Sequence, residues 1–138
     1  MASPLESVRT TALAGLVVAA VATVGSLYYS VGLGYYPCEL CWYQRVAMYP
    51  LVVILGYAAA VDMGDVHRLV LPFSTVGLAL AGYHSWLQVA GTEACAFGGC
   101  AVVQYELAGV LSIPNQAAIA FALITAIMAA RWMTVRGS

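Results

Sequence analysis

The strongest constraint on this chain is that four long stretches contain no Asp, Glu, Lys or Arg. They cover residues 10–38, 46–61, 69–92 and 107–130 of the 138. A helix that crosses a bilayer needs about 20 apolar residues, because roughly 30 Å of hydrocarbon is covered at about 1.5 Å per residue. The sequence therefore predicts an all-α fold, an integral membrane four-helix bundle in a single domain. We expect spans at approximately 10–33, 38–61, 69–90 and 114–133.

The composition excludes several other classes of protein. Charged side chains make up 8% of the chain and hydrophobic ones 63%, whereas soluble domains carry roughly 25% charged residues. All 5 basic residues are Arg and the net charge is -1, so no basic patch is available to hold phosphates. A soluble globular domain, a disordered chain and a nucleic-acid binder are therefore disfavoured.

The few charges predict how the bundle is oriented. With four spans, both termini share one side of the membrane with the connection between the second and third spans. That side carries Arg9, Arg68, Arg131 and Arg136. The opposite side has no Arg or Lys but contains Glu39, Glu93 and Glu106. Because basic residues favour the cytoplasmic side, we expect both termini to be cytoplasmic.

All four cysteines then fall on the outer face, where an oxidising compartment allows disulfides to persist. Cys38 and Cys41 lie at the start of the second span, where unpaired backbone N–H groups and the helix dipole stabilise a thiolate. Cys95 and Cys100 lie in the outer loop 91–113, with two glycines between them. An accessible disulfide of that kind exchanges readily. A closed zinc site is disfavoured because one pair lies at the membrane edge, and we expect no metal.

Two polar side chains within the spans need a reason to be there. Arg45 lies four residues after Cys41, so the two share a helix face. A guanidinium keeps its charge at neutral pH, and its field would favour a thiolate or a partly reduced ligand oxygen. His84 lies in the outer half of the third span, where it could donate a hydrogen bond or carry a proton. The structural alternatives are a snorkelling Arg beside an inert disulfide and a His that bonds a neighbouring helix.

Together these residues predict a redox relay. The loop pair is suited to meeting a protein, and the pair at the membrane edge is suited to meeting a lipid-soluble acceptor. Thiol–disulfide exchange can move two electrons from one pair to the other. A quinone fits the acceptor, since it is flat and apolar and its oxygens gain charge and protons that Arg45 and His84 could assist.

The motif Pro37-Cys38-Glu39-Leu40-Cys41-Trp42-Tyr43-Gln44-Arg45 resembles the signature of the DsbB family of membrane disulfide-generating proteins. That signature is a Pro-Cys-x-x-Cys followed by an Arg four residues later. The segment His84-Ser85-Trp86-Leu87-Gln88, followed by a cysteine-bearing loop, is similar to the same family. The resemblance covers essentially the whole chain. The short separation of the loop cysteines resembles the branch found in Gram-positive bacteria and archaea rather than the enterobacterial branch.

The resemblance implies a quinone-dependent protein-dithiol oxidoreductase in the cell membrane of a prokaryote. It would reoxidise a DsbA-like thioredoxin-fold oxidase and pass electrons to ubiquinone or menaquinone. By position, Cys95–Cys100 would exchange with the partner, Cys95 being favoured by chain order, and Cys38–Cys41 would oxidise that loop pair. Cys41 would contact the quinone. Arg45 would help to bind it, with His84 nearby.

Three other functions are weighed against this one. A vitamin K epoxide reductase-like enzyme also joins thiols to quinones, but there the redox Cys-x-x-Cys lies in a late span. A structural membrane protein could carry two inert disulfides, which would not pass electrons to added quinone. A transporter would need polar residues along a path through the core, whereas Arg45 and His84 lie in one leaflet.

Overall fold

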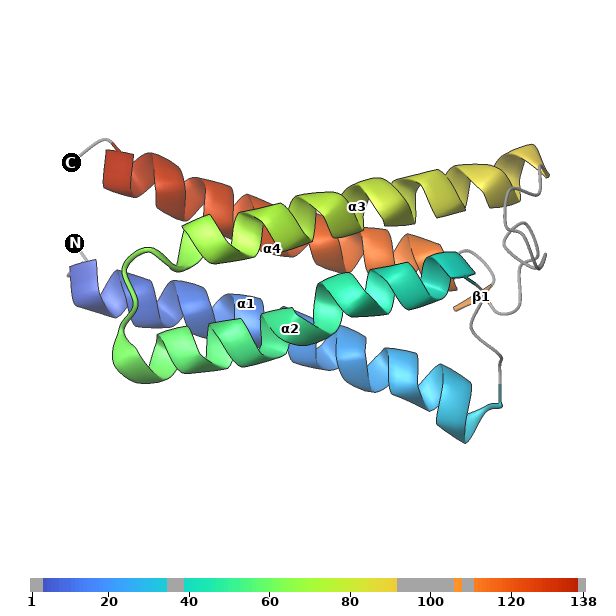
Figure 1. The fold of residues 1–138 in the computed structure, drawn as a ribbon, viewed down its shortest axis with the longest axis horizontal. Coiled ribbons are helices and arrows are strands. Elements are labelled where there is room, and N and C mark those ends of the chain that lie inside the picture. Colours follow the sequence, from blue (N-terminus) through green and yellow to red (C-terminus); the bar gives the residue numbers. More distant parts are fainter. Residues whose placement is uncertain (1–3, 35–38, 92–105, 108–110, 137–138) are drawn as a thin grey trace.

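The computed structural model describes residues 4–34, 39–91, 106–107 and 111–136, and the side chains of 8–34, 40–91 and 112–134. Four long helices run side by side through this part of the chain (Figure 1). They are α1 (Pro4–Leu27), α2 (Glu39–Val61), α3 (Val66–Ala90) and α4 (Ile113–Arg136). A π-helical turn, η1 (Tyr28–Gly32), continues α1. Two short strands, β1 (Glu106–Leu107) and β2 (Leu111–Ser112), pair antiparallel before α4.

The helices form a bundle in which each helix packs against the next in sequence and α4 packs back against α1. This order places α1 diagonally across from α3. Of the described helices, three are long and apolar enough to cross a membrane, over Val8–Gly32, Leu40–Val61 and Ile113–Thr134. The remaining helix, α3, has 25 residues, and polar side chains such as His84 and Gln88 interrupt its apolar sequence. The predicted all-α membrane bundle of four helices is confirmed.

Two details differ from what the apolar stretches alone suggest. The helices continue past the expected spans, α1 starting at Pro4 and α4 ending at Arg136. Helix propagation adds one hydrogen bond per residue, so a helix does not stop where its apolar run stops. The loop 91–113, which the sequence analysis left without secondary structure, contains the β1–β2 pair, with Leu107 opposite Leu111.

Small and branched side chains fill the space between the helices. Phe121 of α4 is fully buried against α3, where Gly77 leaves room for its ring to approach the helix backbone. At the end of the bundle away from the chain termini, Leu40 packs with Leu87, which fixes the start of α2 against the end of α3. The rest of the core includes Ala12, Ala19, Leu51, Leu55, Val70, Ala81, Ile124 and Met128.

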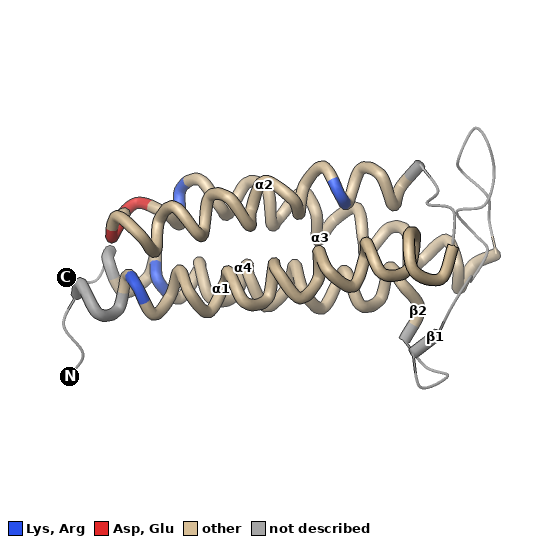
Figure 2. Tube along the Cα trace, turned by 90° about the horizontal axis from the view of Figure 1, so that it is seen from below, with Lys and Arg blue, Asp and Glu red and all other residues tan. Residues whose placement is uncertain are grey.

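The outward surface of the bundle is apolar along its length. Its exposed valines lie on α1, η1, α2 and α3: Val17, Val21, Val31, Val46, Val53 and Val89. Soluble monomers rarely expose contiguous apolar surface of this kind, whereas lipid covers it at no cost. Figure 2 shows the described basic residues at the end that holds the chain termini, except one in α2, which is Arg45. At that end Arg9 pairs with Asp62 at 3.3 Å.

Candidate functional site

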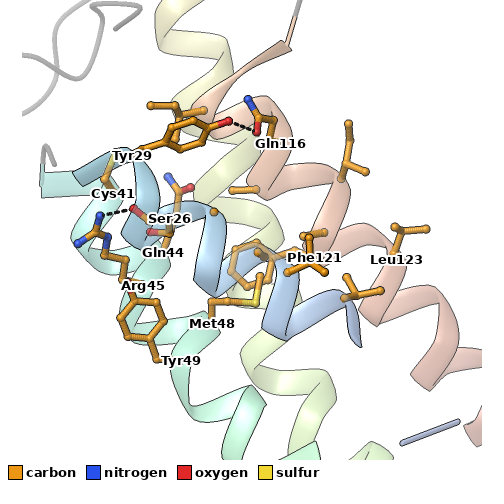
Figure 3. A pocket seen from close by; sticks show the side chains of 18 of the residues that line it. Ser26, Tyr29, Cys41, Gln44, Arg45, Met48, Tyr49, Gln116, Phe121 and Leu123 are labelled. Atoms are coloured by element: carbon orange, nitrogen blue, oxygen red, sulfur yellow. Dashed lines mark hydrogen bonds between the residues drawn. The ribbon is translucent and has the colours of Figure 1, made fainter. Parts of the chain in front are cut away.

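A cavity of about 450 Å³ opens between α1, α2 and α4. Its wall is mainly aliphatic and includes Val17, Val18, Val21, Ala22, Ile113, Ala117, Ile119 and Leu123. Polar side chains also line it, among them Ser26, Tyr29, Gln44, Arg45 and Gln116. Figure 3 shows the polar contacts at one end and Met48 and Phe121 further along. The cavity therefore combines a polar end with an apolar one.

Cys41 belongs to the wall of this cavity and is half-buried there. It lies in the first turn of α2, which begins at Glu39. The backbone N–H groups of a first turn have no partner within the helix, and together with the helix dipole they stabilise a negative charge. The local structure therefore gives the sulfur of Cys41 a position that suits a thiolate.

Arg45 lines the same cavity one helical turn further along α2. Its Nη2 donates a hydrogen bond to the carbonyl oxygen of Ser26 at 3.1 Å. Its Cζ lies 5.0 Å from the centroid of the Trp42 ring, within the range of a cation–π contact. These two contacts hold the guanidinium at the cavity wall. Neither partner carries a charge, so the positive charge of Arg45 is not neutralised. Among the described side chains, no carboxylate forms an ion pair with Arg45.

The π-helical turn shapes the opposite wall. Its wider hydrogen bond runs from the N–H of Leu33 to the carbonyl of Tyr28 at 2.9 Å, and turns of this kind are frequent at functional sites. The hydroxyl of Tyr29 donates to Oε1 of Gln116 at 2.7 Å, which joins η1 to α4 across the polar end of the cavity (Figure 3). Sequence reasoning missed both residues, and their only signal was polarity within an apolar run.

His84 lies behind the cavity wall. Its Nδ1 is 3.0 Å from Nε2 of Gln44, and both side chains are buried, at 2% and 6% exposed. The amide N–H of Gln44 can donate to this nitrogen when the ring carries its proton on Nε2. No described residue of α3 lines the cavity, because α3 is diagonal to α1. Gln44, which the sequence analysis did not single out, is therefore the link between His84 and the cavity.

Comparison with known proteins decides the family. The profile described as "Disulfide bond formation protein DsbB" matches residues 8–131. The chain belongs to the DsbB family. As a member of that family, it is a membrane disulfide oxidoreductase.

Two relatives show how far the similarity extends. The "Probable disulfide formation protein" of Deinococcus radiodurans is 42% identical over 124 residues, covering 80% of this chain and 81% of the relative. "Disulfide bond formation protein C" of Bacillus subtilis is 42% identical over 120 residues, covering 83% and 87%. No solved structure matches the chain significantly. The similarity to the DsbB family thus spans most of both chains.

Several residues of the predicted relay lie outside the described part of this DsbB-family chain. They are Cys38, Cys95 and Cys100, together with most of the loop 91–113. The structure brings Cys41 and Arg45 to one cavity and places His84 one hydrogen bond behind it. The pairing and order of the four cysteines stay predictions.

Proposed function

We propose that this protein oxidises a DsbA-like thioredoxin-fold partner and passes the electrons to a membrane quinone of the ubiquinone or menaquinone type. The observation that carries the proposal is that Cys41 and Arg45 line one largely apolar cavity between α1, α2 and α4. A thiol, a fixed cation and an apolar wall together suit a lipid-soluble electron acceptor whose oxygens become negative.

The cavity fits a quinone in size and chemistry. Its volume of about 450 Å³ lies within the roughly 300–1,000 Å³ of small-molecule pockets. The aliphatic wall from Val17 to Val21 and at Leu123 suits an apolar ring and tail, and the polar end at Arg45 suits the ring oxygens. A bound quinone supplies the acceptor for two electrons and two protons.

The proposed electron path runs through two exchanges. A reduced partner dithiol breaks the Cys95–Cys100 disulfide, and the loop dithiol then breaks the Cys38–Cys41 disulfide. Each exchange forms one S–S bond and breaks one. Overall the partner gains a disulfide, and its two electrons and two protons reduce the quinone to the quinol. Arg45 would favour the thiolate of Cys41 and the developing charge on a ring oxygen, in a low dielectric where its field is strong.

In the proposed site, His84 lies behind the cavity wall and contacts it through Gln44. Because Gln44 occupies its Nδ1, the ring would act through Nε2 or by keeping Gln44 in place. We place the cysteines on the extracytoplasmic side of a prokaryotic plasma membrane, since Arg9, Arg68 and Arg131 lie at the opposite end of the bundle from Cys41 and basic residues favour the cytoplasm.

The test is quinone-dependent oxidation of a reduced thioredoxin-fold partner by the purified full chain and by four single Cys→Ser variants. We expect each variant to lose turnover with quinone, because each removes one sulfur from the relay. A protein with two inert disulfides would give no quinone reduction even in the unmodified chain. Partner oxidation that persists in Cys38→Ser would overturn the relay.

A further inference from the structure

Two positions are open to the charged end of Arg45. A long basic side chain near the end of a membrane helix can turn outward, so that its charge reaches the polar surface of the membrane. Arg45 lies in the second turn of α2, near enough to the end of that helix for such a turn. In the structure the side chain instead lines the cavity. The contacts of the guanidinium decide between the two positions.

The guanidinium has two contacts of different kinds. Its Nη2 donates to the backbone carbonyl of Ser26 at 3.1 Å (Figure 3). The same carbonyl accepts from the hydroxyl of Ser30 at 3.3 Å, so two donors share it. The other contact is with the ring of Trp42, whose centroid lies 5.0 Å from Cζ of Arg45. Ser26 contributes its backbone and Trp42 its side chain, so a substitution of Trp42 removes the second contact and leaves the first.

Trp42 touches the guanidinium without belonging to the cavity wall. It precedes Arg45 by three residues, so the two side chains are neighbours on one helix face. The Trp42 side chain is 50% exposed on the surface of the bundle, and it is not among the residues that line the cavity. Tryptophan favours the interface between lipid and water, which suits a residue in the first turn of α2. The ring can therefore hold the guanidinium without occupying the space that a ligand needs.

We propose that Trp42 is a positioning residue for the quinone, because its ring keeps the charge of Arg45 at the cavity and opposes its turning outward. This inference rests on the proposed function and adds a residue to it. The face of an aromatic ring attracts a cation, most strongly in Trp, and more so where water is excluded. Without the ring, a smaller fraction of molecules would hold the guanidinium at the cavity. The apparent affinity for quinone falls in proportion to that fraction.

The experiment measures turnover of the full chain in detergent, with a reduced thioredoxin-fold protein as electron donor and a para-benzoquinone with a decyl tail as acceptor. We expect Trp42→Leu to raise the KM for the quinone roughly 3- to 10-fold, the loss of one cation–π contact. Saturating quinone should draw the guanidinium back to the cavity, so kcat should stay unchanged. Trp42→Phe and Trp42→Tyr keep an aromatic face and should raise the KM less. In an Arg45→Met background, Trp42→Leu should have no further effect.

Trp86→Leu is the matched control. Trp86 belongs to α3, is 57% exposed, stacks on Tyr83 and does not line the cavity, so its loss should leave the KM for quinone unchanged. The inference is overturned, while the relay stands, by an unchanged KM in Trp42→Leu or by an equal rise in Trp86→Leu. It is also overturned if Trp42→Phe matches Trp42→Leu, if kcat falls in place of a rise in KM, or if the effect persists in Arg45→Met. Failure of the unmodified chain to reduce the quinone would overturn the proposed function itself.

Discussion

A single methyl group at Gly77 should push α3 and α4 apart. A Cβ built on Gly77 would meet three atoms of the Phe121 ring, Cε1, Cζ and Cδ1, all at under 3.0 Å. Real carbon atoms do not approach that closely, so something must move. The ring is 0% exposed, so it can give way only by displacing packed neighbours or by moving toward the cavity that it also lines.

The magnitude follows from comparing two glycines on the same helix. Overpacking a tight core typically costs about 1–3 kcal/mol, while Gly to Ala within a helix gains up to about 1 kcal/mol of intrinsic propensity. At Gly82, also in α3, an added Cβ meets nothing within 4 Å. Gly82→Ala therefore gains helix propensity without a steric clash. The difference in unfolding free energy between the two alanine variants isolates the clash, at about 1–3 kcal/mol.

The assay is denaturant unfolding of the full chain in mixed micelles, followed by far-ultraviolet circular dichroism. Gly77→Ala should be less stable than Gly82→Ala by the amount above, and Phe121→Leu introduced into Gly77→Ala should recover part of the loss by removing the ring edge. Because Phe121 also lines the cavity, quinone affinity should fall in Gly77→Ala alone. Equal stability of the two alanine variants would refute the packing argument.

Three further predictions concern charge and polarity. Arg45→Met should weaken quinone use more than thiol exchange with the partner, since its field acts at the cavity; equal quinone affinity, measured by titration, contradicts that role. Gln44→Leu removes the donor to buried His84 and should cost about 1–3 kcal/mol, less in a His84→Leu background; purely additive costs in a double-mutant cycle refute the coupling. Burial lowers the pKa of His67, which precedes the expected span 69–90, from its ordinary 6.5, outweighing the raising effect of Asp65. The unfolded chain then binds more protons, so stability should fall as the pH drops through 6.5, and His67→Gln should remove that dependence; an unchanged slope speaks against it.

The fold was largely predictable because lipid imposes one requirement on a whole segment at once. Every backbone N–H and C=O in hydrocarbon must find a partner within its own helix, so long runs without charge predict helices by length alone. The π-helical turn at Tyr28–Gly32 was not predictable from these runs. The turn depends on a backbone N–H that bonds to the carbonyl five residues earlier instead of four, as Leu33 does to Tyr28. An apolar run carries no signal for such a shift.

The site was predictable only where its residues are close in sequence. Cys41 and Arg45 share a helix face by spacing, and both line the cavity. Tyr29 and Gln116 are 87 positions apart, and nothing local says that α4 packs back against α1. Likewise the sequence did not single out Gln44 beside Arg45. Its role depends on a contact with His84, which belongs to another helix.

The contacts of Arg45 also bear on how the chain enters the membrane. An Arg costs up to roughly 2.5–3.5 kcal/mol to insert in an isolated spanning helix, the most at its centre. Arg45 lies in the second turn of α2, and the Ser26 carbonyl that receives it belongs to the preceding helix. During synthesis α1 leaves the ribosome before α2, so that acceptor is already present when Arg45 arrives. We expect α1 and α2 to be released into lipid together, as a hairpin, with the guanidinium satisfied before it meets hydrocarbon.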